Sequence, residues 1–178
     1  MNENNEKLRL VHIYMGNGKG KTTAALGLAI RAVGWKMKVG IIQFMKGWPQ
    51  YGELTSLSRF PEIKLIQTGR PDFVDKKAPL QIDIDEAHRG LVIAREWVEK
   101  GLFDLVILDE INVALDYELI ELKDVISLLQ KRSSHVELVL TGRNPPKDLL
   151  PYADLITEMK EIRHPYTKGI LGRKGFDY

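Results

Sequence analysis

Apolar positions along the chain follow two periods, one typical of buried strands and one typical of amphipathic helices. Short continuous apolar runs predict strands over residues 8–15, 38–44, 63–68, 102–108, 136–140 and 155–162. Between these runs, apolar residues recur three and four positions apart, which predicts helices over 24–35, 54–60, 82–100 and 119–130 and one helical turn after Pro146. Strands that alternate with helices are typical of an α/β fold with a mostly parallel sheet and helices on both faces.

One segment between a predicted strand and a predicted helix, residues 69–79, shows neither period and contains Pro71 and Pro79. Loops of this length in compact domains often carry function, so we expect a mobile surface loop here. The chain shows no internal repeat and no linker composition, so residues 1–178 are interpreted as a single domain. We expect residues 1–7 to be flexible and residues 164–178 to form a C-terminal tail.

Composition and charge narrow the class of protein. With 44% hydrophobic and 28% charged residues, the 178-residue chain resembles an ordinary soluble domain rather than a disordered one. Its formal net charge is only +2, which gives no electrostatic basis for binding nucleic acid. The absence of cysteine excludes disulfides, thiolate metal sites and a catalytic thiol. No apolar run reaches the length of a membrane span and the N-terminus does not resemble a secretory signal, so we expect a cytoplasmic protein that binds no membrane.

The first predicted strand leads into a glycine-rich loop, Gly-Asn-Gly-Lys-Gly-Lys-Thr-Thr at residues 16–23, and the first predicted helix follows it. The backbone N–H groups of such a loop and the positive end of the helix dipole bind phosphate. We expect the Lys21 side chain to contact phosphate oxygens and the Thr22 hydroxyl to ligate Mg²⁺. The common pattern G-x-x-x-x-G-K-[ST] is one residue longer, because Gly16 lies only five positions before Lys21. The predicted phosphate-binding residues are Gly16, Asn17, Gly18, Lys19, Gly20, Lys21, Thr22 and Thr23.

Two acidic residues, Asp109 and Glu110, end the apolar run that precedes them. Taken alone, this pattern is explained equally well by a strand that exits into solvent, with Asp109 capping the next segment. Combined with the glycine loop, it indicates a magnesium site in which Asp109 holds the ion and Glu110 orients or coordinates it. We therefore expect Thr22, Asp109 and Glu110 as metal ligands, and Lys21, Thr22 and Glu110 as catalytic residues. The two motifs predict a P-loop NTPase-like fold that binds a nucleoside triphosphate, but they do not distinguish which bond of the nucleotide is broken.

The glycine loop, residues 16–25, resembles the shortened phosphate loop of the ATP:corrinoid adenosyltransferases of the cobalamin pathway. Further segments that resemble this family follow in order along the chain: Gln-Phe-Met-Lys-Gly at 43–47 with Gly-Glu at 52–53, Leu-Asp-Glu at 108–110 with Asp-Tyr at 116–117, Leu-Thr-Gly-Arg at 140–143, and Lys-Gly-Ile at 168–170 with Gly-Phe-Asp-Tyr at 175–178. The resemblance therefore covers essentially the whole chain.

The resemblance implies a RecA-type sheet and transfer of the 5′-deoxyadenosyl group of ATP to the reduced cobalt of a corrinoid, either cob(I)alamin or a precursor. Triphosphate would be released, in cobalamin biosynthesis or salvage. The resemblance also implies Mg²⁺ as cofactor, ATP and the corrinoid as substrates, an electron-transfer flavoprotein as a partner, and a homodimer. Reduced cobalt is itself a strong nucleophile, so the protein needs only to hold the ribose 5′-carbon in line and to stabilise charge on the triphosphate.

Lys46 follows the second predicted strand and Arg143 follows the fifth, so both are expected at the carboxyl edge of the sheet, where open α/β folds bind ligands. We expect both side chains to contact the nucleotide, although solvated surface positions explain them as well. In the family that the chain resembles, Thr-Gly after the third strand is followed by two closely spaced aromatic residues that help to displace the lower axial ligand of the corrinoid. Here Thr-Gly at 68–69 is followed by Arg-Pro-Asp-Phe, so only Phe73 is aromatic. Phe73 is expected either to contact the corrinoid or to anchor its own loop.

Two other classes of function remain open. A small ATPase or kinase would cleave the nucleotide at phosphorus and yield ADP, whereas a RecA-like, nucleotide-gated binding module would bind single strands, against which the low net charge counts. His12, in the first predicted strand, is expected to be structural rather than a ligand. The preferred corrinoid, the displacement of its lower ligand, the nucleotide orientation, the strand order, the oligomeric state and the physiological reductant are not determined at this level.

Overall fold

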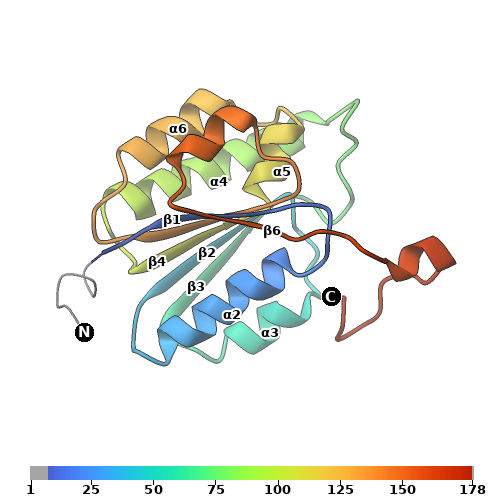
Figure 1. Ribbon diagram of the computed structural model, residues 1–178, viewed down its shortest axis with the longest axis horizontal. Coiled ribbons are helices and arrows are strands. Elements are labelled where there is room, and N and C mark those ends of the chain that lie inside the picture. Colours follow the sequence, from blue (N-terminus) through green and yellow to red (C-terminus); the bar gives the residue numbers. More distant parts are fainter. Residues whose placement is uncertain (1–7, 178) are drawn as a thin grey trace.

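The computed structural model describes residues 8–177, and these form one six-stranded sheet in the order β3-β2-β4-β5-β1-β6 (Figure 1). The strands are β1 (Val11–Met15), β2 (Val39–Phe44), β3 (Ile63–Thr68), β4 (Leu105–Asp109), β5 (Glu137–Thr141) and β6 (Leu155–Glu158). Every neighbouring pair is parallel. The predicted α/β class and parallel sheet are therefore confirmed, and the expectation for residues 1–7 lies outside the described range.

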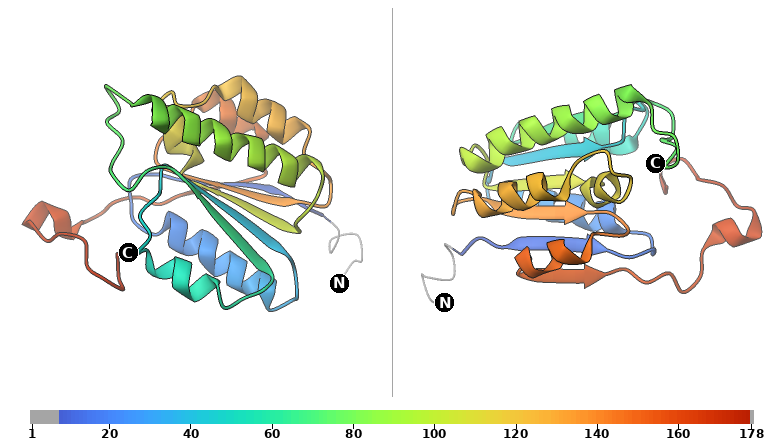
Figure 2. Two further views of the ribbon diagram at one scale, coloured as in Figure 1. Left: turned by 180° about the vertical axis from the view of Figure 1, so that it is seen from behind. Right: turned by 90° about the horizontal axis from the view of Figure 1, so that it is seen from above.

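Helices cover both faces of the sheet, as Figures 1 and 2 show. On one face lie α2 (Lys21–Val33) and α3 (Gly52–Leu57). On the other lie α4 (Gln81–Glu99), α5 (Ile111–Asp116), α6 (Leu122–Gln130) and the 3-10 helix η1 (Lys147–Tyr152). A second 3-10 helix, η2 (Pro165–Lys168), stands away from the sheet, and the chain after it returns toward the start of α2 (Figure 2). Within residues 8–177, no helix is long and apolar enough to cross a membrane.

Alternate residues of the central strands point to opposite sides of the sheet and fill two separate cores. Phe44, Leu108 and Leu140 belong to the cluster on the α4 side. Ile41 and Ile107 belong to the cluster on the α2 side, where alanines of α2 allow the helix to lie close to the sheet. Every residue of β2 and β4 is buried, because helices cover both faces of these central strands, and this burial explains their continuous apolar runs.

Several boundaries differ from those that the pattern predicts. α2 begins at Lys21 rather than at residue 24, so the lysine lies in the first turn of the helix. Residues 111–116 form α5, which was not predicted because six residues following an apolar strand show no helical period of their own. α6 begins at residue 122 rather than 119, because the apolar residues before it are buried outside the helix. β6 ends at Glu158 rather than at residue 162, because the chain then turns to pack against the glycine loop.

Candidate active site

The carboxyl ends of the parallel strands meet at one edge of the sheet, and a cavity of about 700 Å³ opens there. Side chains and loops that follow β1, β2 and β4 all reach it, together with the N-terminal turn of α2. Most of the predicted site residues line this cavity: Asn17, Gly18, Lys19, Gly20, Lys21, Thr22, Thr23, Lys46, Phe73, Glu110 and Arg143. The other two, Gly16 and Asp109, do not line it but each hydrogen-bonds to a lining residue.

The glycine loop is held against the segment that follows β6. Gly16 N donates to Arg143 O at 3.0 Å, and Gly18 N donates to Met159 O at 2.6 Å. A Cβ on Gly18 would lie only 2.6 Å from that same Met159 oxygen. Gly16 and Gly20 have φ angles of +95° and +115°, which side chains other than hydrogen rarely permit. These glycines are therefore required by close backbone packing and by local conformation.

Lys21 lies in the first turn of α2, and its side chain folds back over the loop that precedes it. Its Nζ donates to Gly16 O at 2.7 Å and to Gly18 O at 2.8 Å. Burial lowers the pKa of this ammonium, and the negative charge of Glu110 acts against that shift. The cation is thus held at the mouth of the glycine loop, where the N–H groups and the helix dipole also attract an anion.

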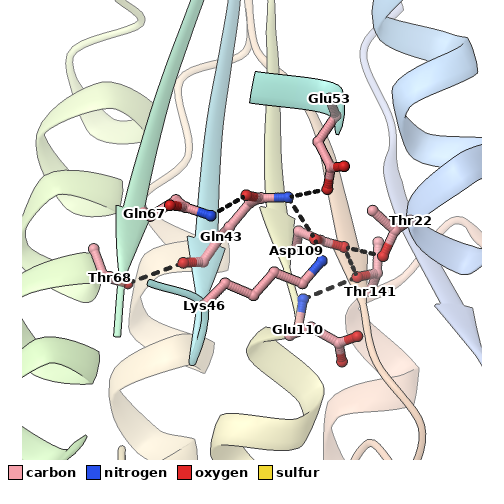
Figure 3. A network of polar contacts seen from close by, with 9 residues as sticks. All are labelled: Thr22, Gln43, Lys46, Glu53, Gln67, Thr68, Asp109, Glu110 and Thr141. Carbon is pink, nitrogen blue, oxygen red and sulfur yellow. Dashed lines mark hydrogen bonds and ion pairs between the residues drawn. The ribbon is translucent and has the colours of Figure 1, made fainter. Parts of the chain in front are cut away.

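Asp109, at the end of β4, is the centre of a buried hydrogen-bond network (Figure 3). Its Oδ1 accepts from Thr22 Oγ1 at 2.8 Å and from Thr141 Oγ1 at 2.7 Å. Its Oδ2 accepts from Lys46 Nζ at 2.7 Å. Three strands and the start of α2 therefore converge on one carboxylate, as strand order β2-β4-β5 requires. Thr22 and Asp109, both predicted as metal ligands, are thus in direct hydrogen-bond contact.

The Thr22 hydroxyl and the Asp109 carboxylate fit the chemistry of a magnesium site. Mg²⁺ prefers oxygen ligands and is commonly held by one or two side chains together with substrate phosphates. No cluster of three or more His, Asp or Glu suited to a metal occurs in residues 8–177, so phosphates or water would have to supply the remaining ligands. That Thr22, Asp109 and Glu110 bind Mg²⁺ stays a prediction.

Glu110 adopts a left-handed backbone conformation, with φ of 63° and ψ of 14°, directly before α5. This conformation is uncommon for residues other than glycine. The Glu110 backbone N donates to Thr141 Oγ1 at 2.9 Å, so its backbone rather than its carboxylate joins the Asp109 network. Burial raises the pKa of Glu110 and the neighbouring Asp109 charge raises it further, against the charge of Lys46. The turn thus places a poorly solvated carboxyl group at the cavity wall.

Lys46 follows β2 and connects the Asp109 network to the rest of the cavity. Burial by itself lowers the pKa of Lys46, but the charge and hydrogen bond of Asp109 outweigh it and raise the pKa overall. The Nζ also lies 5.5 Å from the centre of the Tyr51 ring. Of the two explanations offered for Lys46, a solvated surface position is wrong, because 14% of its side chain is exposed and its charge is paired.

Five polar residues of the network in Figure 3 were not among the predicted site residues: Gln43, Glu53, Gln67, Thr68 and Thr141. Gln43 Nε2 donates to Glu53 Oε1 at 3.1 Å, and Gln43 is fully buried in β2 (Figure 3). A glutamine inside an otherwise apolar buried strand needs hydrogen-bond partners, so the sequence pattern could have indicated Gln43 as part of a polar network. Thr141 offered a similar indication, because a threonine ends the buried strand β5 at the same edge of the sheet.

The C-terminal tail forms part of the cavity wall. Lys19 Nζ donates to Phe176 O at 2.7 Å and is paired with the Asp177 carboxylate. Both tail residues line the cavity. Arg143 is exposed and lines the cavity from the loop after β5. The glycine loop therefore lies between the tail on one side and the Asp109 network on the other.

Two smaller cavities, of about 440 and 500 Å³, share lining residues with the first. Phe73 lines all three, and it is 98% exposed. The Tyr51 ring also lines all three and stacks edge-on with Trp48 at 5.4 Å between ring centres. Loop anchoring therefore does not explain the Phe73 ring. An apolar surface therefore lies directly beside the cavity over the glycine loop.

Comparison with known proteins gives a match over nearly the whole chain. The sequence profile of the family described as ATP:corrinoid adenosyltransferase BtuR/CobO/CobP matches residues 7–178. The chain is 35% identical over 166 residues to the corrinoid adenosyltransferase of Pseudomonas aeruginosa, covering 93% of this chain and 82% of that protein. It is 34% identical over 175 residues to the corrinoid adenosyltransferase CobA of Salmonella typhimurium, covering 97% and 87%. The chain is also 36% identical over 174 residues to an uncharacterized protein of Nostoc. That match covers 90% of this chain but only 46% of the Nostoc protein.

Proposed function

Because the chain belongs to the ATP:corrinoid adenosyltransferase family, we propose that it transfers the 5′-deoxyadenosyl group of ATP to the reduced cobalt of a corrinoid, in cobalamin biosynthesis or salvage. The observation that carries the proposal is the continuity of two surfaces. The cavity over the glycine loop suits a triphosphate, and the adjoining cavities with Phe73 and Tyr51 suit an apolar ring system. A nucleotide and a large flat co-substrate can therefore meet at one edge of the sheet.

In the proposed reaction the cobalt attacks the ribose 5′-carbon with its electron pair. The bond between C5′ and the triphosphate oxygen breaks, and its electrons leave on that oxygen, so inorganic triphosphate is released. The attacking cobalt carries no proton, so no side chain needs to act as a base. Catalysis then depends on alignment of the 5′-carbon and on stabilisation of the departing charge.

The residues of the glycine loop are assigned to the second of these tasks. We infer that the Lys21 ammonium and the backbone N–H groups of the glycine loop other than those of Gly16 and Gly18 bind the triphosphate, with Arg143 and Lys19 at the rim of the same cavity. Thr22 and Asp109 would hold Mg²⁺, which when bound offsets negative charge on the phosphates. Glu110, whose carboxyl group is poorly solvated at the cavity wall, is assigned to orienting the ligands of that site.

Lys46 has a positioning task in this scheme. Its ammonium pairs with Asp109 and stands beside Tyr51, so it joins the acidic end of β4 to the apolar cavities. Family membership further leads us to propose a cytoplasmic homodimer whose corrinoid substrate is reduced by an electron-transfer flavoprotein. Gel filtration with light scattering tests the first point, and a coupled assay with a reduced flavoprotein tests the second.

The decisive experiment is an anaerobic assay of the purified chain with Mg²⁺, ATP and chemically reduced cobalamin. The corrinoid absorption spectrum reports formation of the cobalt–carbon bond, and chromatography identifies the phosphate product. We expect adenosylcobalamin and inorganic triphosphate in equal amounts. ADP as the product, or an unchanged corrinoid spectrum under verified reduction, would instead indicate an ATPase or kinase. Omitting Mg²⁺ in a parallel reaction tests the metal requirement.

A further inference from the structure

One arginine side chain, Arg70, holds the first part of the loop between β3 and α4, while Lys76 ties a later part of it to Asp116. Arg70 Nε donates to Asp83 Oδ1 at 2.7 Å, Nη1 donates to Asp72 Oδ2 at 3.2 Å, and Nη2 donates to the Phe73 carbonyl oxygen at 2.9 Å. A guanidinium group is planar and presents its donors in fixed directions. The three contacts therefore fix the path of the backbone from Arg70 to Phe73.

The partner that anchors this arginine is itself immobile. The Asp83 side chain is 1% exposed and lies in the first turn of α4. Its second oxygen, Oδ2, accepts a hydrogen bond from Leu80 N at 2.9 Å, at the start of the helix. A buried carboxylate needs a paired cation, and Arg70 supplies the one that Asp83 contacts. The Arg70 side chain is thus anchored to the first turn of α4, a helix of 19 residues.

The start of the loop is tied to the candidate active site. A Cβ on Gly69 would lie 2.6 Å from Lys46 N, and a Cβ on Gly47 would overlap Gly69 O. The backbone before Arg70 therefore packs directly against the segment that carries Lys46. With Gly69 held by this packing and residues 70–73 held through the Arg70–Asp83 pair, the first part of the loop keeps a fixed relation to the Asp109 network.

The ring of Phe73 is the exception in this well-held segment. Its carbonyl oxygen is bonded, yet its side chain is 98% exposed and borders all three cavities. An apolar ring in water is stabilised when a ligand covers it. A fixed backbone with a free ring at the junction of cavities is the geometry of a contact surface for a co-substrate.

We propose that Arg70 is a positioning residue for the corrinoid: by bridging Asp83 and the Phe73 carbonyl, it holds the Phe73 ring where an apolar face of the second substrate can cover it. This inference rests on the proposed function. Arg70 lines one of the two smaller cavities, but its donors are taken up by Asp83, Asp72 and the Phe73 carbonyl, so in this scheme it is not a substrate contact. It acts only through the place that it gives to Phe73.

The chemistry of lysine separates this positioning task from a purely structural one. In Arg70→Lys, an ammonium can still pair with the Asp83 carboxylate, so the buried charge stays neutralised. A single ammonium cannot reproduce the planar fork that also reaches the Phe73 carbonyl. Arg70→Lys should therefore keep the thermal midpoint of the wild type but lose the placement of the ring. Arg70→Ala should lower the thermal midpoint and should also lose the placement of the Phe73 ring.

The test compares the wild type with Arg70→Lys, Phe73→Ala and the double variant in the anaerobic assay. For Arg70→Lys and for Phe73→Ala we expect kcat/KM for reduced corrinoid to fall by between about 10-fold and 100-fold, as for a misplaced substrate contact, while KM for ATP is unchanged. The double variant should be no worse than Phe73→Ala, because the two residues act as one unit. Arg95→Lys is the matched control, since it makes the same change in an arginine that pairs with Asp124 of α6 and lines none of the three cavities, and it should behave as the wild type.

Each other outcome has a definite meaning. If Arg70→Lys shows both the kcat/KM and the thermal midpoint of the wild type, Arg70 is purely structural and the inference is overturned. Losses that multiply in the double variant would show that Arg70 does not act through Phe73, and this would overturn it too. An inactive wild type would refute the proposed function itself, which distinguishes that failure from a failure of Arg70 alone.

Discussion

Lys21 and Asp109 are both held by hydrogen bonds before any ligand is considered. The ammonium of Lys21 donates to two carbonyl oxygens of its own loop, and both carboxylate oxygens of Asp109 accept from named side chains. Groups that are fixed in advance need little reorganisation when charge develops on a substrate, and this is the basis of electrostatic catalysis. The individual side chains of the site are therefore preorganised.

At the residue scale, we predict that Lys21→Ala lowers kcat by about 10²-fold to 10³-fold, the usual effect of removing one preorganised charge-stabilising group. The reason is that the departing triphosphate would lose the buried cation of the glycine loop. Single-turnover rates at saturating ATP measure the effect. Lys100→Ala, which removes an exposed lysine at the end of α4, is the control. Full activity in Lys21→Ala would contradict the assignment of the phosphate cavity.

The connection from β1 through the glycine loop to α2 has a fixed backbone path, because three of its positions do not accept a side chain. Gly20, with φ of +115°, leads directly into the helix, and Gly16 and Gly18 pack against Met159. Met159 follows β6, so the segment after the edge strand packs against the backbone of the glycine loop. The packing explains the glycines of the loop independently of any ligand.

At the element scale, Gly18→Ala and Gly27→Ala form a matched pair of substitutions. The added methyl at residue 18 would meet Met159 O at 2.6 Å, so we expect Gly18→Ala to lose about 1–3 kcal/mol of unfolding free energy and to raise KM for ATP. At residue 27, within α2, the methyl meets nothing within 4 Å. Gly27→Ala should gain about 0.5–1 kcal/mol with unchanged kinetics. Urea denaturation and ATP titration measure both, and equal behaviour of the pair would argue against the packing account.

Over the whole molecule, the sheet joins distant parts of the chain through β1, which pairs with β5 on one side and β6 on the other. A side-chain contact links β1 to β5, in which His12 Nε2 lies 2.6 Å from Glu137 Oε1. Glu137 Oε2 also accepts from Leu10 N at 2.7 Å. The expectation that His12 is structural agrees with this position in the sheet.

At the scale of the whole molecule, Glu137 predicts a pH dependence of stability. Burial would raise the pKa of Glu137, but hydrogen bonds from His12 and Leu10 N outweigh it and lower the pKa below its ordinary value of 4.5. A carboxylate with a lowered pKa in the folded chain stabilises the fold above pH 4.5, and this stabilisation is lost as the pH falls through the lowered value. Wild type should therefore exceed Glu137→Gln in unfolding free energy at neutral pH, and the two should converge in acid. Denaturation curves over a pH series measure this, with Glu99→Gln at the exposed end of α4 as control; a constant difference would contradict it.

Residues that are adjacent in the chain are enough to predict the kinds of elements, the α/β class and the glycine loop. Burial on both faces produces the apolar runs of β2 and β4, and a left-handed turn or close backbone packing requires glycine at residues 16, 18 and 20. Such requirements are local and can be detected in a short window. Where a local signal was too short, as in the six residues of α5, the prediction missed the element.

Which polar side chains meet depends on contacts between distant segments of the chain, and the fold alone provides these contacts. The order β2-β4-β5 brings Lys46 and Thr141 to the same carboxylate as Thr22, although these residues lie far apart in the sequence. Arg70 likewise finds Asp83 only after the loop has crossed to the start of α4. No window of sequence contains these contacts, because each depends on the distance between strands or helices rather than along the chain. Strand order and helix placement therefore convert local motifs into one site.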